Sequence, residues 1–178
     1  MFSVLFIFSN CIAQKRKVGK INTKINEEYA KSSKEFYGKL DSVQNKEIRG
    51  IMAIELNTDI TENKAILINY YQYGNNCFEY GFNKKEANNV LENGLKISAR
   101  MSKENNTVDF FVYSEDALNK KSFINNKLFK LDNGFFSQNI FTLKENCSAF
   151  FILKPDGNFM KYYGFDYYSI VEEFLKRK

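Results

Sequence analysis

The sequence contains no histidine and no tryptophan, and it has one proline and three cysteines among 178 residues. The missing histidine is the most restrictive of these absences. It excludes Ser-His-Asp and Cys-His nucleophilic sites, removes the usual general base, and leaves few ways to build a zinc site. Catalysis near neutral pH would have to depend on cysteine, lysine, tyrosine or carboxylate side chains. We therefore expect no metal and no cofactor, and we favour a binding or structural role over an enzymatic one.

The residues that are present are typical of a folded domain. Hydrophobic residues make up 44% of the chain and aromatic residues 16%, which is a globular composition. The length suits one domain with a core large enough to fold unaided. The formal net charge is +5, and its densest runs, Lys15-Arg16-Lys17 and Lys176-Arg177-Lys178, resemble solvated tails more than a nucleic-acid surface. We expect no nucleic-acid partner.

Residues 1–13 are uncharged and apolar and end in Cys11-Ile12-Ala13. The segment is shorter than the ~20 residues that span a bilayer, and small residues before a polar stretch mark a signal-peptidase site. It resembles the signal peptides of secreted Bacteroidetes proteins, many of which end in Ala-Gln. We therefore expect a signal peptide over residues 1–13, a mature chain that begins at Gln14, and a periplasmic or secreted protein.

Two alternatives to this cleavage stay open. Phe8-Ser9-Asn10-Cys11 could be a lipobox, in which case Cys11 is lipidated and the protein is an anchored lipoprotein. The segment could also be a buried N-terminal strand. Membrane attachment is expected only if Cys11 is lipidated.

Residues 14–47 are predicted to form a basic segment and an amphipathic helix. Apolar residues fall at helical spacing from about Asn26 to about Val43. The next run, Ile48 to Leu56, is apolar enough for a strand. We therefore expect an N-terminal helical extension before a main domain over residues 48–178.

The main domain is organised around a buried-strand signal, Ala65-Ile66-Leu67-Ile68, which continues into Tyr70 and Tyr71. This strand breaks at Gly74-Asn75-Asn76 and displays Cys77 at its tip. A capping box at Asn83-Lys84-Lys85-Glu86 then begins a helix.

Gly94 leaves the length of this helix open. It is either an internal residue or the cap of a short helix. In the second case Leu95 to Met101 would be a strand and residues 103–106 a hairpin turn.

The C-terminal half is predicted to contain a second buried strand and a hairpin. Val108–Tyr113 is the strand, and Glu115–Lys130 is part helix and part loop. Ala149–Leu153 and Phe159–Tyr163 form a hairpin around Lys154-Pro155-Asp156-Gly157, where Pro presets the second turn position. Asp166 is expected to cap a final helix.

This order of elements is similar to that of a thioredoxin-like domain of the TlpA/redoxin type, over roughly Glu55 to Lys178. In that family a strand runs into a C-x-x-C motif at the start of a helix, and the first cysteine attacks disulfides. The window here is Gly74-Asn75-Asn76-Cys77, with glycine in the attacking position. Where the family has a cis-proline before the closing hairpin, this chain has Cys147-Ser148-Ala149.

The resemblance implies an α/β fold, with a thioredoxin-like central sheet flanked by helices and a degenerate active site without dithiol oxidoreductase activity. It places Ile66–Tyr70 parallel to Val108–Tyr113 and next to Ala149–Leu153. Because the family's cis-proline packs against its C-x-x-C motif, it also implies a disulfide between Cys77 and Cys147. Export favours that disulfide as well.

Three interpretations of function follow. The favoured one is an exported cell-envelope binding or structural module, whose partner is an unknown protein or small molecule. The second is a thiol redox protein that uses Cys77 alone, activated at a helix N-terminus. The third is an unrelated α+β interaction module with two hairpins.

Two further groups of side chains are weaker candidates. Asp109, Glu115 and Asp116 could be paired carboxylates or a cation site, although acidic residues near strand ends are commonly just solvated. Clustered tyrosines could line a ligand surface, although core packing is the more ordinary explanation. They are Tyr70, Tyr71, Tyr73, Tyr80, Tyr162, Tyr163, Tyr167 and Tyr168.

Overall fold

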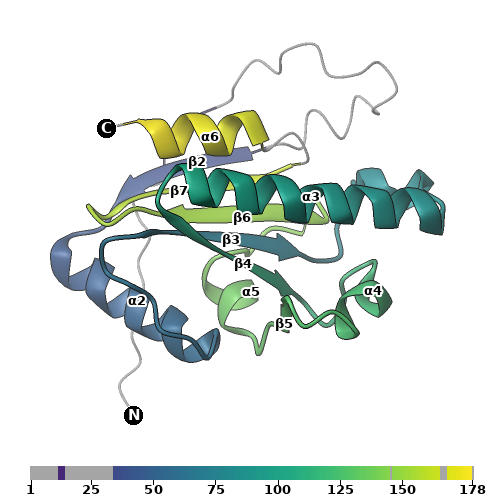
Figure 1. The fold of residues 1–178 in the computed structure, drawn as a ribbon, viewed down its shortest axis with the longest axis horizontal. Helices are drawn as coiled ribbons and strands as arrows, with labels where there is room; N and C mark the ends of the chain where they lie inside the picture. The colour runs from purple at the N-terminus through teal and green to yellow at the C-terminus, as the bar shows by residue number, and fades with distance from the viewer. Residues whose placement is uncertain (1–11, 15–33, 145, 165–167, 178) are drawn as a thin grey trace.

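A mixed β-sheet forms the centre of the computed structural model, which describes residues 12–14, 34–144, 146–164 and 168–177. Its strand order is β1-β2-β7-β6-β3-β4-β5 (Figure 1). The strands are β1 (Ile12–Gln14), β2 (Lys34–Lys39), β3 (Ala65–Tyr71), β4 (Thr107–Tyr113), β5 (Phe129–Leu131), β6 (Ser148–Leu153) and β7 (Asn158–Tyr163).

Helices cover both faces of this sheet. They are α2 (Ser42–Glu55), α3 (Lys84–Glu104), α4 (Lys120–Ile124), α5 (Phe135–Asn139) and α6 (Tyr168–Lys176), with a short 3-10 helix η1 (Phe78–Gly81). Helices α2 and α5 lie on one side of the sheet, and α3 and α6 lie on the other (Figure 1). The α/β class is therefore confirmed. None of the helices in the described part of the chain is both long enough and apolar enough to span a bilayer.

Strand β3 is the centre of the fold, because its residues are buried from Ala65 to Tyr70. It pairs in parallel with β4 and antiparallel with β6, so that Ile68 lies between Phe110 and Phe151. Side chains of a strand alternate between faces, and those of β3 enter two cores. Ile66 and Ile68 pack in the cluster that contains α2 and α5, and Leu67 packs in the cluster that contains α6.

The predicted helix over residues 26–43 is wrong where the structure describes it. Lys34–Lys39 is strand β2, which pairs antiparallel with β7. The helix begins later, because Asp41 and Gln44 form a reciprocal capping box at its start. Val43, which completed the helical spacing, is 74% exposed.

The predicted strand Ile48–Leu56 is also wrong, because these residues belong to α2 and its C-cap. Ile48, Met52 and Leu56 are buried at a spacing of four residues, which is the spacing of one helical face. Ile54 would share a strand face with Met52, yet it is 78% exposed. The expected boundary between residues 47 and 48 falls inside this helix.

Gly94 lies inside α3, which runs without a break from Lys84 to Glu104. The strand alternative for Leu95–Met101 is therefore wrong, and so is the hairpin turn at residues 103–106. The capping box of Asn83 with Glu86 is confirmed. It holds the start of a helix that leads from the end of β3 to the parallel strand β4.

The closing hairpin of β6 and β7 is confirmed. Its turn has the expected bond from the Gly157 amide to the Lys154 carbonyl, at 3.1 Å. Gly157 has a φ of +86°, which glycine adopts without strain. The final helix is present as α6, while its expected cap Asp166 lies outside the described residues.

Most of the N-terminal expectation also lies outside the described residues. This includes residues 1–11, with Cys11 and the proposed lipobox. Ile12 to Gln14 form β1, which pairs antiparallel with β2.

Substitutions in α2 test whether this segment is a helix. Met52→Ala should lower the free energy of unfolding by about 2–5 kcal/mol, because it empties a fully buried site. Ile54→Ala should change it by less than about 0.5 kcal/mol, because the side chain faces solvent. Urea titrations of both variants measure this difference. Similar losses at both positions would favour a strand.

Candidate functional site

Two loops meet at the carboxyl end of β3. One loop continues β3 through residues 72–77, and the other leads from α5 into β6 through residues 141–147. Their backbones are joined by a bond from the Gln72 amide to the Cys147 carbonyl, at 3.0 Å, and by one from Asn75 to Lys144, at 3.1 Å. The two loops therefore form one junction.

The side chain of Gln72 makes this junction specific. Gln72 is fully buried, and its Nε2 donates to the carbonyl oxygens of Leu143 at 2.7 Å and Asn146 at 2.9 Å. An unpaired buried amide would cost about 1–3 kcal/mol. Sequence reasoning missed this residue, although a lone amide directly after an apolar strand was the available signal.

A disulfide between Cys77 and Cys147 closes the junction. The two Cα atoms are 5.0 Å apart, inside the ~4.4–6.8 Å that disulfides usually span. Cys77 is 6% exposed and Cys147 is 3% exposed, so each thiol is both bonded and buried. Cys77 leads into η1, and Cys147 leads into β6.

Gly74 is required by close packing within the junction. A Cβ at this position would lie 2.3 Å from the carbonyl carbon of Asn146 and 2.7 Å from the amide nitrogen of Cys147. No side chain fits there without movement of the backbone, so a thiol at this position would not be accommodated. Within the same window, Asn75 is exposed and Asn76 half-buried.

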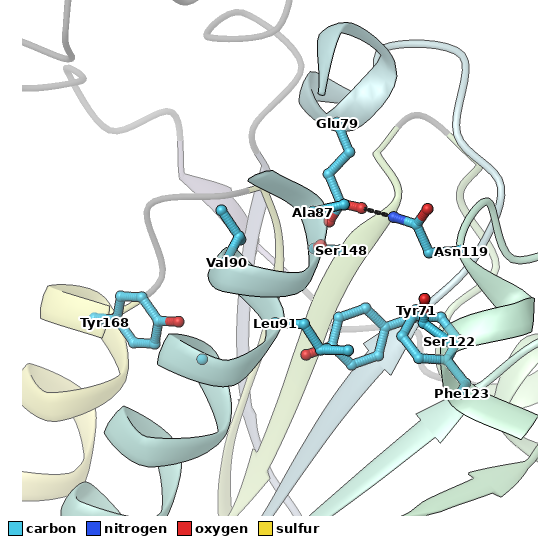
Figure 2. A pocket seen from close by; sticks show the side chains of 11 residues that line it. Tyr71, Glu79, Ala87, Val90, Leu91, Asn119, Ser122, Phe123, Ser148 and Tyr168 are labelled. Carbon is cyan, nitrogen blue, oxygen red and sulfur yellow. Dashed lines mark hydrogen bonds between the residues drawn. The ribbon is translucent and has the colours of Figure 1, made fainter. Parts of the chain in front are cut away.

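A pocket lies beside the junction, between α3 and the ends of η1, α4 and α6 (Figure 2). Its empty volume is about 460 Å³, part of which is open solvent at its mouth. Most of the lining is apolar or aromatic. The lining residues are Tyr71, Glu79, Ala87, Val90, Leu91, Gly94, Asn119, Ser122, Phe123, Ser148 and Tyr168.

The disulfide fixes two walls of this pocket. Glu79 is two residues after Cys77, and Ser148 directly follows Cys147. Ser148 is also the register partner of Tyr71 in the sheet. Among Gly74, Asn75, Asn76, Cys77, Cys147 and Ser148, which the resemblance singled out, Ser148 lines this pocket.

Glu79 is the one carboxyl group among the residues that line the pocket. Its Oε2 accepts a hydrogen bond from Nδ2 of Asn119 (Figure 2). Burial raises the pKa of Glu79 to about 7, and the bond from Asn119 only partly offsets this effect. Burial also raises the pKa of the neighbouring Tyr71 far above its ordinary value of 10, so Tyr71 stays neutral. Sequence reasoning missed Glu79, because nothing local to it indicates burial.

The other acidic candidates each have a partner of their own. Asp109 accepts a bond from Ser98, and the contacts of Glu115 and Asp116 include Lys120 and Lys144. In the described part of the chain, no group of three or more histidine, cysteine or acidic residues could hold a metal ion.

The tyrosines have separate roles. Tyr70 donates to Asp132 in the core, and Tyr162 and Tyr163 are also buried there. Tyr73 and Tyr80 are exposed, and the hydroxyl of Tyr80 donates to the Gly74 carbonyl at 2.9 Å. Tyr71 and Tyr168 line the pocket, and Tyr167 lies outside the described residues.

Gly74→Ala tests the packing of the junction. We expect it to lower the free energy of unfolding by about 1–3 kcal/mol or more, because the added methyl group meets backbone atoms. Gly50→Ala is the control, since Gly50 lies in α2 with no atom within 4 Å of an added Cβ. It should raise stability by about 0.5–1 kcal/mol. A neutral Gly74→Ala variant would contradict the close approach.

Glu79→Gln tests the half-buried carboxyl group. The folded-state pKa of about 7 lies above the ordinary value of 4.5, so the unfolded chain ionises first as pH rises through this window. Ionisation therefore lowers stability between these pH values, and the cost is complete above about pH 7. The variant should match the parent near pH 4.5 and exceed it at pH 8 by at most about 3 kcal/mol.

Denaturant titrations at both pH values measure this effect. Glu92→Gln is the matched control, because Glu92 is exposed on α3. It should shift stability equally little at both pH values. An equal response of the two variants would mean that Glu79 is solvated.

Comparison with known proteins identifies no relative of this chain. No protein-family model matches it, and none of the curated proteins or solved structures compared with it gives a match. Function must therefore be argued from the chemistry of the junction and the pocket.

Proposed function

We propose that this chain is an exported binding module of the cell envelope, built on a thioredoxin-like scaffold whose redox site has become a structural disulfide. The pocket beside the disulfide is its binding site. The observation that carries the proposal is the packing of Gly74 against the backbone of Asn146 and Cys147. This position corresponds to the attacking thiol of the family, and it leaves no room for a side chain.

The arrangement of strands supports the scaffold. Ile66–Tyr70 pairs in parallel with Val108–Tyr113 and antiparallel with Ala149–Leu153, as the resemblance implies. Helix α3 connects the two parallel strands, and α3 and α6 share one face of the sheet (Figure 1). Strands β5 and β2 extend this arrangement at its two sides.

The state of the cysteines supports a binding role over a redox role. Cys77 is paired with Cys147 and buried, whereas a reactive cysteine needs an accessible thiolate. Hydrogen bonds from Gln72 and Asn75 hold the two loops together beside the disulfide. The disulfide therefore adds a covalent link between two loops that these hydrogen bonds also join.

Export is part of the same proposal. Residues 1–13 have the composition of a signal peptide, and a structural disulfide is typical of an oxidising compartment such as the periplasm. We place the protein in the periplasm or outside the cell, or at the membrane if Cys11 carries a lipid.

An insulin-reduction assay tests the proposal. The oxidised protein should not accelerate the reduction of insulin by dithiothreitol above the background rate. The double variant Cys77→Ser/Cys147→Ser should behave identically in this assay. The opposite result would be faster insulin reduction with the parent protein but not with the double variant. That result would establish the redox alternative and refute the binding module.

The same double variant tests the disulfide. Peptide mapping without reduction should recover the Cys77 and Cys147 peptides as one linked species. Removal of a bridge that spans 70 residues should lower the free energy of unfolding by about 4 kcal/mol in the chain-entropy model. Equal melting temperatures for parent and variant would contradict a stabilising disulfide.

A further inference from the structure

Glu79 is a carboxyl group without a cationic partner. Its only hydrogen bond among the described residues comes from the neutral amide of Asn119, and no lysine or arginine contributes to its ionisation. An ionised carboxylate in such surroundings is costly unless a positive charge pairs with it. A cation bound at this end of the pocket would therefore stabilise the ionised form of Glu79.

The walls around Glu79 suit the body of a small organic cation. Tyr71, Phe123 and Tyr168 contribute aromatic rings, and Val90 and Leu91 contribute aliphatic groups from α3. In Figure 2, Glu79 extends toward Asn119, and the ring of Tyr71 lies below this pair. Ring faces attract cations that are held away from water, and apolar walls stabilise a hydrocarbon body.

We propose that the pocket binds a small primary amine, whose ammonium group pairs with the Glu79 carboxylate and whose apolar body packs against Tyr71 and Leu91. The inference rests on the proposed function, since it names the ligand of the same pocket. A carboxylate or phosphate ligand would be repelled by the ionised form of Glu79. A neutral ligand of the same shape gains the packing but not the ion pair.

The pH dependence of binding can be assigned to Glu79. The charged and titratable groups that face it from the surrounding elements are Tyr71 of β3 and Tyr168 of α6, while α3 and α4 contribute apolar, hydroxyl and amide groups. Glu79, with a pKa of about 7, is mostly neutral at pH 6 and mostly ionised at pH 8. An alkyl ammonium keeps its charge over this range, so the amine should bind about tenfold more tightly at pH 8 than at pH 6.

The experiment is calorimetric titration of the full chain with 2-phenylethylamine, and with 2-phenylethanol as the neutral probe of the same shape. At pH 8 the amine should bind the parent protein at least about tenfold more tightly than the alcohol does. Glu79→Gln should remove this preference, because its amide is neutral. Glu92→Gln, on the exposed side of α3, should retain it. Circular dichroism establishes that both variants are folded.

The outcomes separate this inference from the proposed function. Equal affinity for the two probes, or undiminished amine binding by Glu79→Gln, would refute the inference that Glu79 selects an amine. The proposal that the pocket is a binding site would still stand. Failure of both probes to bind would also refute the amine. The binding module itself fails only if the insulin-reduction assay detects activity that depends on the two cysteines.

Discussion

The meeting of two loops at the carboxyl end of β3 is the constraint on which the rest of this structure depends. The buried amide of Gln72 donates to the carbonyl groups of Leu143 and Asn146. Because an unpaired buried amide is costly, these bonds hold residues 141–147 beside residues 72–77. The disulfide joins the same two chain segments beside these hydrogen bonds. Gly74 permits the two loops to lie this close together, because a side chain at this position would collide with the backbone of Asn146 and Cys147.

The pocket follows from the same junction. Cys77 directly precedes η1, which carries Glu79, and Cys147 directly precedes β6, which begins at Ser148. The disulfide therefore links two walls of the pocket. Helix α3 provides a third wall, and its buried Gly94 removes a side chain where the helix borders the cavity. A redox site needs an accessible thiol, whereas Cys77 and Cys147 are bonded to each other and buried beside this cavity.

Glu79 is a half-buried carboxyl group for which no cationic partner is seen among the described residues. Burial raises its pKa to about 7, so the folded protein is less stable near neutral pH than it would be with a neutral side chain at this position. Features that lower stability without a structural gain are expected at functional sites. Its side-chain partner in the described chain is the neutral amide of Asn119, and it lies at one end of a pocket with aromatic walls. This combination is the reason to look for a ligand at Glu79.

The sequence by itself determined the elements whose cause is local. The apolar run of β3, the capping box of α3 and the Pro155 turn of the closing hairpin each depend on residues a few positions apart, so their patterns could be recognised directly. Tertiary structure decided the rest. Lys34–Lys39 is a strand because β7 offers it a pairing edge. Ile48–Leu56 is a helix whose buried apolar residues, Ile48, Met52 and Leu56, lie on the one face that meets the sheet. The environments of Gly74 and Glu79 are set by residues distant in sequence. The backbone of Asn146 and Cys147 packs against Gly74. Asn119 and Tyr71 lie next to the carboxyl group of Glu79. A local pattern does not report on such neighbours, because steric closeness and burial arise only when the chain is folded.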